Sequence, residues 1–169
     1  MSTSVATTEP ERRAWRMLGD VADPEIPVIS VVDLGIVREL HARPDGGIEV
    51  GLSPTYSGCP ATVVIRERVV QALEQGGFAP VIVREVLSPP WSSDWISTAG
   101  RERLARYGIA PPAQAVSSVR ALHHAPAPVR CPRCGSARTS EVSAFGSTPC
   151  KALHRCEDCR EPFEYFKCI

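Results

Sequence analysis

Four cysteines near the end of the chain have a spacing that suits metal chemistry. They form two Cys-x-x-Cys pairs, Cys131 with Cys134 and Cys156 with Cys159. Each pair can place both sulfurs on one side of a tight turn, and two such turns can enclose a tetrahedral Zn²⁺ ion with Zn–S bonds of about 2.3 Å. Because the protein then fills all four coordination positions, the pattern predicts a structural zinc site. Metal binding would supply folding free energy that so short a segment lacks.

Three other potential ligands lie close to these pairs: Cys150, Cys168 and His154. We expect the two thiols to pack in a small core, where a free cysteine behaves as an apolar group. The alternative is that they help to bind an iron–sulfur cluster, which also accepts four thiolates, so spacing alone does not distinguish zinc from iron. For His154 we expect a solvated position on a strand rather than a metal ligand.

The remaining cysteine, Cys59, has no other cysteine near it and is flanked by Gly58 and Pro60 before an expected helix. The N–H groups and dipole at a helix N-terminus stabilise an anion, which favours the thiolate form of a cysteine placed there. A nucleophile, a redox sulfur or a soft-metal ligand would suit this position. The alternative is a buried cysteine packed beneath the sheet.

Oxygen-bearing side chains precede Cys59 in two loops. Asp23 and Glu25 flank a proline after the first expected helix, and Thr55 follows the second expected strand. Turn formation and solvation explain the two acids, which could also bind a hard ion such as Fe²⁺. Thr55 could simply form a hydrogen bond within its own loop.

The overall composition excludes several classes of protein. Lys and Arg together number 19, as do Asp and Glu, so the formal net charge is zero. A general nucleic-acid-binding protein would show a basic surface instead. No apolar run approaches the roughly 20 residues that cross a bilayer, and the first residues do not resemble a secretion signal. We therefore expect a cytoplasmic protein without membrane or nucleic-acid partners, whose cysteines stay reduced.

The rest of the sequence predicts an α+β fold. After a disordered start at 1–8, a domain over 9–109 should hold a small three-stranded sheet packed by helices. The expected elements are a helix, a hairpin of two strands, a helix, a strand and a last helix, at 9–22, 36–42, 48–52, 61–75, 80–87 and 94–107. A capping box at Thr8 and Glu11 starts the first helix. A Pro/Ala-rich stretch at 110–128 should be a semi-rigid linker, followed by a zinc ribbon at 129–169.

Several of these segments, taken together, resemble known families. The segments Asp23–Pro27 and Val32–Val37 and the pattern Thr55-x-x-x-Cys59-Pro60 are similar to the SufT-type iron–sulfur assembly domain. Four segments near the end resemble PaaD, a family of accessory components of the phenylacetyl-CoA 1,2-epoxidase system: Cys131–Ser136, Phe145–Thr148, Cys150–Ala152 and Glu161–Phe163. The resemblance covers nearly all of residues 9–169.

The resemblance implies a non-catalytic accessory protein of aerobic phenylacetate degradation. Such a protein would help to mature the iron–sulfur or di-iron centres of the epoxidase's reductase and oxygenase components, which would be its partners. It further implies that Cys59 transfers iron or a transient cluster, with Asp23, Glu25 and Thr55 around the same pocket. Since one cysteine cannot fill the four protein-ligand positions of a [2Fe–2S] cluster, a homodimer or ligands from a partner would complete the site.

Three other functions stay open. The chain could be an enzyme in which Cys59 attacks a substrate, although His41 is the single histidine of the first domain and no recognisable motif places it beside that thiol. It could be a zinc-ribbon nucleic-acid-binding protein, against which its neutral charge argues. It could also be a purely structural component that stabilises the epoxidase complex, a reading that shares every sequence feature with the assembly factor.

Overall fold

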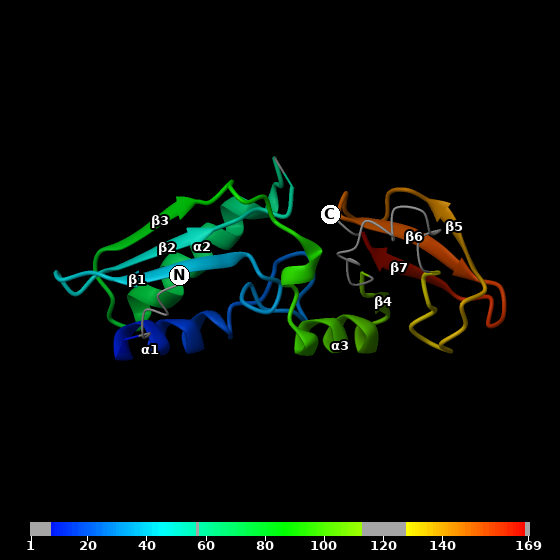
Figure 1. The fold of residues 1–169 in the computed structure, drawn as a ribbon, viewed down its shortest axis with the longest axis horizontal. Coiled ribbons are helices and arrows are strands. Elements are labelled where there is room, and N and C mark those ends of the chain that lie inside the picture. The colour runs from blue at the N-terminus through cyan, green and yellow to red at the C-terminus, as the bar shows by residue number, and fades with distance from the viewer. Residues whose placement is uncertain (1–7, 57, 113–127, 168–169) are drawn as a thin grey trace, which may run out of the picture. The chain divides into compact units, whose positions relative to one another are not determined.

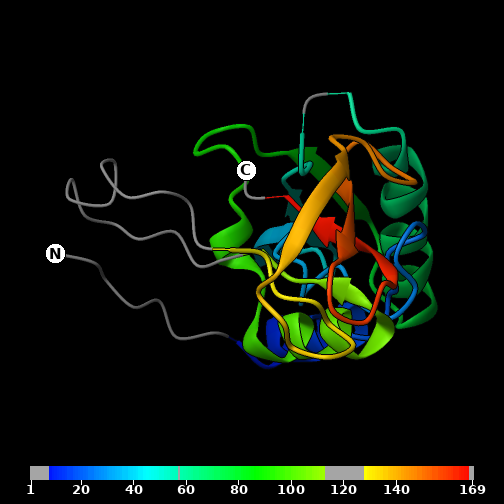
Figure 2. The same cartoon turned by 90° about the vertical axis from the view of Figure 1, so that its right-hand side faces the viewer.

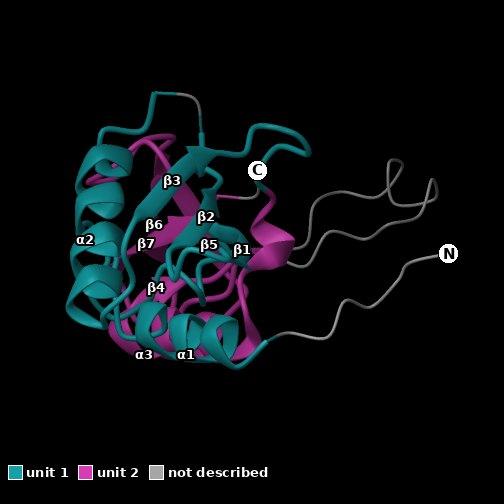
Figure 3. Cartoon of the chain, turned by 90° about the vertical axis from the view of Figure 1, so that its left-hand side faces the viewer, with its two compact units in different colours: residues 1–91 teal, residues 92–169 magenta. Residues whose placement is uncertain are grey.

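The computed structural model describes residues 8–56, 58–112 and 128–167. The chain divides into two compact units, residues 1–91 and 92–169, coloured separately in Figure 3. One unit contains a three-stranded sheet and the other a four-stranded sheet, with helices in both (Figure 1). The α+β class predicted from the sequence is therefore confirmed. The expected disordered start, apart from Thr8, and most of the expected linker lie outside the described residues.

The first unit begins with a helix, a hairpin, a second helix and a third strand, in the predicted order. Its elements are α1 (Glu9–Leu18), β1 (Val37–Ala42), β2 (Ile48–Leu52), α2 (Ala61–Gln75) and β3 (Val81–Glu85). The predicted capping box is present, because the Glu11 N–H donates to Thr8 Oγ1 while the Thr8 N–H donates to Glu11 Oε2. Helix α1 ends at Leu18, with Gly19 as its C-cap, and not near residue 22 as we expected.

The sheet of the first unit has the order β1-β2-β3. Strands β1 and β2 form the predicted antiparallel hairpin, whose turn uses Gly46 at a φ of 85°. Strand β3 pairs with β2 in parallel, since α2 carries the chain back across the sheet between them. Helix α1 packs against β1 and α2, and α2 packs against β3. Six apolar residues of the two helices are buried: Ala14, Leu18, Ala61, Ile65, Val69 and Leu73.

A compact loop at 19–36 joins α1 to β1. A backbone bridge between Ala22 and Ser30 closes the loop, and the Val31 N–H donates to the Val21 carbonyl at 2.9 Å. Ile26 and Ile29 are buried inside it. The loop is therefore held by backbone hydrogen bonds and by buried apolar side chains, and it carries two of the predicted site residues, Asp23 and Glu25.

The second unit contains a short 3₁₀ turn, one helix and a sheet in the order β4-β7-β6-β5. Its elements are η1 (Ser93–Trp95), α3 (Thr98–Tyr107), β4 (Ile109–Ala110), β5 (Thr139–Ser143), β6 (Lys151–Cys156) and β7 (Pro162–Phe166). Gly108 ends α3 in the left-handed conformation, with a φ of 99°, as predicted. Strands β6 and β7 run antiparallel side by side (Figure 1 and Figure 2).

Strand β4 is the element that the sequence did not indicate. Ile109 and Ala110 pair in parallel with Glu164 and Tyr165 of β7, so the segment after α3 completes the sheet of the ribbon. The sequence placed α3 in the first domain and began the linker at residue 110. The domain boundaries at 109, 110–128 and 129 stay a prediction, and the two units differ from them by grouping α3 and β4 with the ribbon.

Candidate metal centre and assembly site

The four paired cysteines converge in the second unit. Their sulfur atoms all lie within 4.8 Å of one another. Across the two pairs, the Sγ atoms of Cys131 and Cys159 are 3.7 Å apart, and those of Cys134 and Cys156 are 3.6 Å apart. A tetrahedral ZnS₄ site with 2.3 Å bonds has S–S edges of about 3.8 Å, whereas a disulfide bond is about 2.05 Å long. The cluster therefore fits a tetrahedral metal ion and not a pair of disulfides.

Backbone turns place these sulfurs. In the first turn the Gly135 N–H donates to the Cys131 carbonyl at 2.9 Å, and Gly135 has a φ of 76°. In the second turn Arg160 takes up the left-handed conformation, with a φ of 65°, which is uncommon for a residue other than glycine. Side chains tie the two turns together, because Ser136 Oγ and the Arg138 guanidinium both donate to the Asp158 carboxylate.

The electrostatics of the cluster suit a cation. Hydrogen bonds, the strongest of them from the Cys159 backbone N–H, lower the pKa of the Cys156 thiol to about 7 against the opposing effect of burial. The Glu161 N–H acts to lower the pKa of the Cys159 thiol, but burial and the three neighbouring sulfurs together raise it to about 12. Four thiolates this close repel one another, so a divalent ion that binds them must displace protons and then compensates their charge.

The remaining candidates of the ribbon differ from one another. Cys150 is buried with its Sγ 3.1 Å from Thr148 Oγ1, outside the four-sulfur cluster, which agrees with the expected core position. His154 lies on a strand, β6, and outside the four-sulfur cluster, as expected. The expectation that it is solvated was wrong, since its side chain is buried against Phe163 and Tyr165, at ring distances of 5.7 and 5.4 Å. Burial lowers the pKa of His154. Cys168 lies outside the described residues.

His154 is buried because of the strand alternation in β6. Successive side chains of a strand point to opposite faces, so His154 shares a face with Ala152 and Cys156, both of which are buried. Cys156 belongs to the core cluster of the ribbon, which contains Ala110, Cys131, Cys156 and Phe163 with Val129, Cys159 and Tyr165 packed against it. A register argument from Cys156 would have placed His154 correctly.

In the first unit, Thr55 and Cys59 lie in the connection between β2 and α2. Thr55 is buried and Cys59 is half-buried. The Cys59 carbonyl accepts a hydrogen bond at 3.1 Å from the N–H of Thr62, the second residue of α2. The N-cap residue Pro60 makes no side-chain cap. The Cys59 thiol thus lies just before a helix whose first N–H groups receive no hydrogen bond from the side chain of Pro60.

Asp23 is a buried carboxylate in the loop between α1 and β1. Its Oδ1 accepts hydrogen bonds from the N–H groups of Glu25 and Ile26, both at 2.8 Å. This oxygen therefore shapes the turn that carries the half-buried Glu25.

The loops that carry these four residues lie at the same end of the sheet. Val37, the first residue of β1, pairs with Leu52, the last residue of β2, and the Ser53 N–H donates to the Ile36 carbonyl at 2.8 Å. From α2, Arg68 Nη1 donates to the Ala22 carbonyl at 3.2 Å, next to Asp23. Backbone connections thus bring the two loops together, while a shared pocket for Asp23, Glu25, Thr55 and Cys59 stays a prediction.

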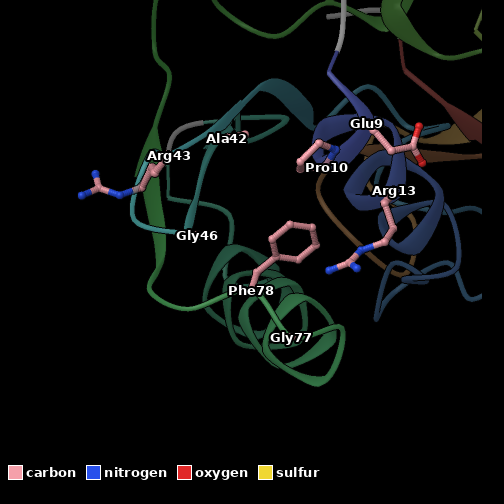
Figure 4. A pocket seen from close by; sticks show the side chains of 9 residues that line it. Glu9, Pro10, Arg13, Ala42, Arg43, Gly46, Gly77 and Phe78 are labelled. Atoms are coloured by element: carbon pink, nitrogen blue, oxygen red, sulfur yellow. The ribbon is translucent and has the colours of Figure 1, made fainter.

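A separate cavity of about 260 Å³ lies at the opposite end of the sheet, near the β1–β2 turn (Figure 4). Its charged groups already have partners within the chain. Arg13 Nη2 donates to the Gly76 carbonyl at 2.7 Å, with its guanidinium 4.5 Å from the centre of the Phe78 ring, and Arg43 pairs with Asp45 at 2.9 Å. The cavity contains none of the predicted site residues and offers no free set of polar groups to a ligand.

Comparisons with known proteins decide the family. The model of an iron–sulfur cluster assembly protein matches residues 11–78, and the model of a PaaD zinc beta ribbon domain matches residues 115–167. An Escherichia coli K12 protein, named as a putative subunit of 1,2-phenylacetyl-CoA epoxidase, is 49% identical over 156 residues, which cover 92% of this chain and 91% of that protein. The chain belongs to the PaaD family. The resemblance stated from the sequence is therefore confirmed.

Other similar proteins match a smaller share of this PaaD-family chain. A Porphyromonas gingivalis protein named Fe-S protein maturation auxiliary factor is 37% identical over 83 residues, 48% of this chain and 78% of that protein. The crystal structure of a domain of unknown function from Bacillus anthracis has a TM-score of 0.53 at 27% identity, covering 56% of this chain and 91% of that one. Within the described part of the chain, no helix is both long and apolar enough to span a bilayer.

Proposed function

We propose that this PaaD-family chain is a non-catalytic, cytoplasmic accessory protein that helps to load the iron–sulfur or di-iron centre of the phenylacetyl-CoA epoxidase reductase or oxygenase component. One observation carries the proposal. An assembly-protein match at residues 11–78 and a PaaD ribbon match at 115–167 occur in one chain, which is 49% identical to a putative epoxidase component across almost its whole length. The related Porphyromonas gingivalis protein is named a maturation factor and not an enzyme.

In this proposal the ribbon has a structural role. Cys131, Cys134, Cys156 and Cys159 hold one Zn²⁺ ion, since their sulfur spacing and their mutual repulsion as thiolates both suit a tetrahedral dication. The ion supplies a cross-link between the two turns. Because all four positions are filled by cysteines, the ion has no open position for a reaction.

Cys59 is the residue that handles the cargo. A half-buried thiol on a loop can be reached by an incoming ion, and thiolate is a soft ligand that binds iron. Transfer is a ligand exchange without electron transfer: a bond between the cargo iron and Cys59 Sγ forms as a donor ligand leaves, and it breaks as a ligand of the client protein takes its place. Glu25 and Thr55 assist from neighbouring positions, and Asp23 orders the loop.

A single Cys59 cannot hold a cluster by itself, because a [2Fe–2S] cluster takes four protein ligands. The proposal therefore needs further ligands, which come from a client protein or from a second copy of the chain. The first arrangement explains most simply how cargo would leave, since the client's own ligands replace those of the carrier.

The test compares Cys59→Ser with the wild type in the host that encodes the protein. We expect the reductase and oxygenase components purified from the Cys59→Ser strain to contain less iron and, for the reductase, less acid-labile sulfide. Val63→Ala, at a position 64% exposed in the first turn of α2, is the matched control and should leave both contents unchanged. Equal zinc content and melting temperature of the two variants would show intact folds. Full metal content with Cys59→Ser contradicts the carrier role and leaves a protein that only stabilises the complex.

A further inference from the structure

Two large apolar side chains of the ribbon, three positions apart in the sequence, are exposed to solvent. Phe145 is 67% exposed and Val142 is 59% exposed. Val142 lies at a register shift in β5, between Glu141 and Ser143, where the ladder to β6 is irregular. A bulge of this kind re-aims the side chain that it contains. Single exposed apolar residues are common and need no special explanation. Whether these two form a binding surface therefore depends on how rigidly the chain holds them.

The β5–β6 connection at residues 144–150, which we call the Phe145 loop, is held by backbone hydrogen bonds. The Gly146 N–H donates to the Lys151 carbonyl at 2.7 Å, and the Lys151 N–H donates to the Thr148 carbonyl at 3.0 Å. The Phe145 N–H donates to Ser143 Oγ at 3.2 Å. An exposed aromatic ring therefore stands on a loop with a fixed conformation.

A buried ion pair also fixes the Phe145 loop. Lys151 Nζ lies 2.8 Å from Glu164 Oε2, and the lysine side chain is 4% exposed. Glu164 Oε1 accepts a further hydrogen bond from the Ser147 N–H at 2.7 Å. A Cβ atom at Gly146 would lie 2.7 Å from this same oxygen, so a larger residue there would have to displace the Glu164 carboxylate. A buried ion pair contributes little net stability but can specify one conformation, and here that conformation is the one that displays Phe145.

The charge beside the ring is positive. Lys167 Nζ donates to the Ala144 carbonyl at 3.1 Å and lies 4.6 Å from the centre of the Phe145 ring. Among the residues that the structure describes, no carboxylate forms an ion pair with Lys167. The charge of Lys151 is balanced by Glu164. A surface that matches the tip of the loop would thus combine an apolar pocket with an acidic rim.

We propose that the Phe145 loop is the site by which this chain docks on another protein component of the epoxidase system, with Phe145 in an apolar pocket and Lys167 facing a carboxylate at its rim. The identity of the partner rests on the proposed function, since the Escherichia coli relative is named as one component of that enzyme. Aromatic side chains dominate binding energies at interfaces, and a loop that is ordered before binding loses little entropy. One lysine beside one ring does not form the basic stripe that nucleic acid requires.

The experiment measures binding of the purified full-length chain to the purified oxygenase and reductase components by biolayer interferometry. Phe145→Ala should weaken binding to one of them by at least about tenfold, as a truncated hot-spot residue does. Lys167→Glu should weaken the same interaction, with a loss that shrinks as salt is raised. Leu87→Ala, at a similarly exposed residue of the first unit, is the matched control and should bind like the wild type. Because Phe145 is mostly exposed, we expect unchanged zinc content and melting temperature.

Several outcomes would overturn the proposal. Wild-type affinity for Phe145→Ala would do so, as would wild-type protein that binds neither component. If Phe145→Ala separates a homodimer, or lowers binding to a DNA duplex, while leaving component binding unchanged, the surface serves a second copy or nucleic acid instead. Cys59→Ser should bind the components like the wild type. If Phe145→Ala weakens binding while Cys59→Ser leaves the iron content of the components unchanged, the docking proposal stands and the carrier role is contradicted. If Phe145→Ala binds normally while Cys59→Ser lowers the iron content, the carrier role stands and the docking proposal is contradicted.

Discussion

Glu11 Oε1 accepts a hydrogen bond from the backbone N–H of Ala42 at 3.1 Å. Its other oxygen, Oε2, accepts from the Thr8 N–H at 2.7 Å. One carboxylate therefore caps α1 and also occupies a donor of β1, an outer strand of the first sheet. Unpaired groups on an outer strand invite pairing with other chains, so Glu11 joins helix formation to protection of the sheet edge.

Replacing Glu11 with Ala should destabilise the first unit by about 2 kcal/mol, because both a capping interaction and a hydrogen bond to the strand are lost. Glu11→Gln keeps one acceptor oxygen and should lose only part of this. The N–H groups of Thr8 and Ala42 hold the pKa of Glu11 below its ordinary value of 4.5. Its contribution is therefore complete above that pH and is lost as the pH falls through the lower, folded-state pKa. Urea unfolding at neutral and acidic pH measures both effects, and a Glu11→Ala loss that persists unchanged at low pH would contradict them.

Removal of metal should unfold the ribbon and leave the first unit folded. We expect one zinc per chain by elemental analysis and, after chelation, loss of amide hydrogen-exchange protection in β5, β6 and β7 with retained protection in α2. The reason is that metal-binding free energy is folding free energy in such a segment. Cys134→Ser should reproduce the loss, whereas Cys150→Ser, outside the four-sulfur cluster, should retain the metal. Full protection of β6 in metal-free protein would show that the ribbon folds without it.

Breaking the ion pair between Lys151 and Glu164 should destabilise the second unit. Lys151→Met leaves a partly buried carboxylate without its cation, for which a cost of about 3 kcal/mol is typical. Burial acts to raise the pKa of Glu164, but the hydrogen bonds from Lys151 and Ser147 outweigh it and lower that pKa. The stabilisation is thus present above the ordinary value of 4.5 and is lost as the pH falls below it. Combining Lys151→Met with Glu164→Leu should recover part of the loss, and a double variant less stable than Lys151→Met would contradict this account.

Arg101→Lys should loosen the start of the second unit. The Arg101 guanidinium donates to the carbonyls of Ser93, Ile96 and Pro112, and an ammonium group cannot reach all three. We expect a loss of about 1–2 kcal/mol and faster hydrogen exchange in β4. Arg106→Lys, at an exposed position of the same helix, is the control. Equal exchange rates in the two variants would argue that Arg101 is not what holds Pro112.

Features formed by residues close together in the sequence could be predicted from the sequence. The capping box at Thr8, the turn before Gly47 and the spacing of the paired cysteines each predicted a feature that the structure contains. Each depends on residues a few positions apart, where propensity and turn geometry decide. Gly19 was a stop signal for α1 that could have corrected its predicted end.

Features that depend on partners far away in the sequence could not be predicted. Strand β4 could not be predicted, because two residues, Ile109 and Ala110, show no periodicity. Their partner strand, β7, also lies more than 50 residues further along the chain. The bond from the Ala42 N–H to Glu11 likewise depends on a strand that lies 31 residues further along the chain. The turn-forming role of Asp23, by contrast, was expected from its place before a proline, and the structure contains it. The grouping of Cys59 with the acids rests on family resemblance, because spacing in sequence cannot show which loops meet at one end of a sheet.

The parallel pairing of β4 with β7 has a practical consequence for anyone who wishes to study the ribbon in isolation. A fragment that starts at residue 115, where the PaaD ribbon match begins, omits Ala110 from the core and removes β4, one of the two strands that pair with β7. Such a fragment would expose an open strand and precipitate readily. A recombinant fragment should start no later than residue 92, so that it retains α3, β4 and Arg101, whose guanidinium bonds to the carbonyls of Ser93 and Pro112.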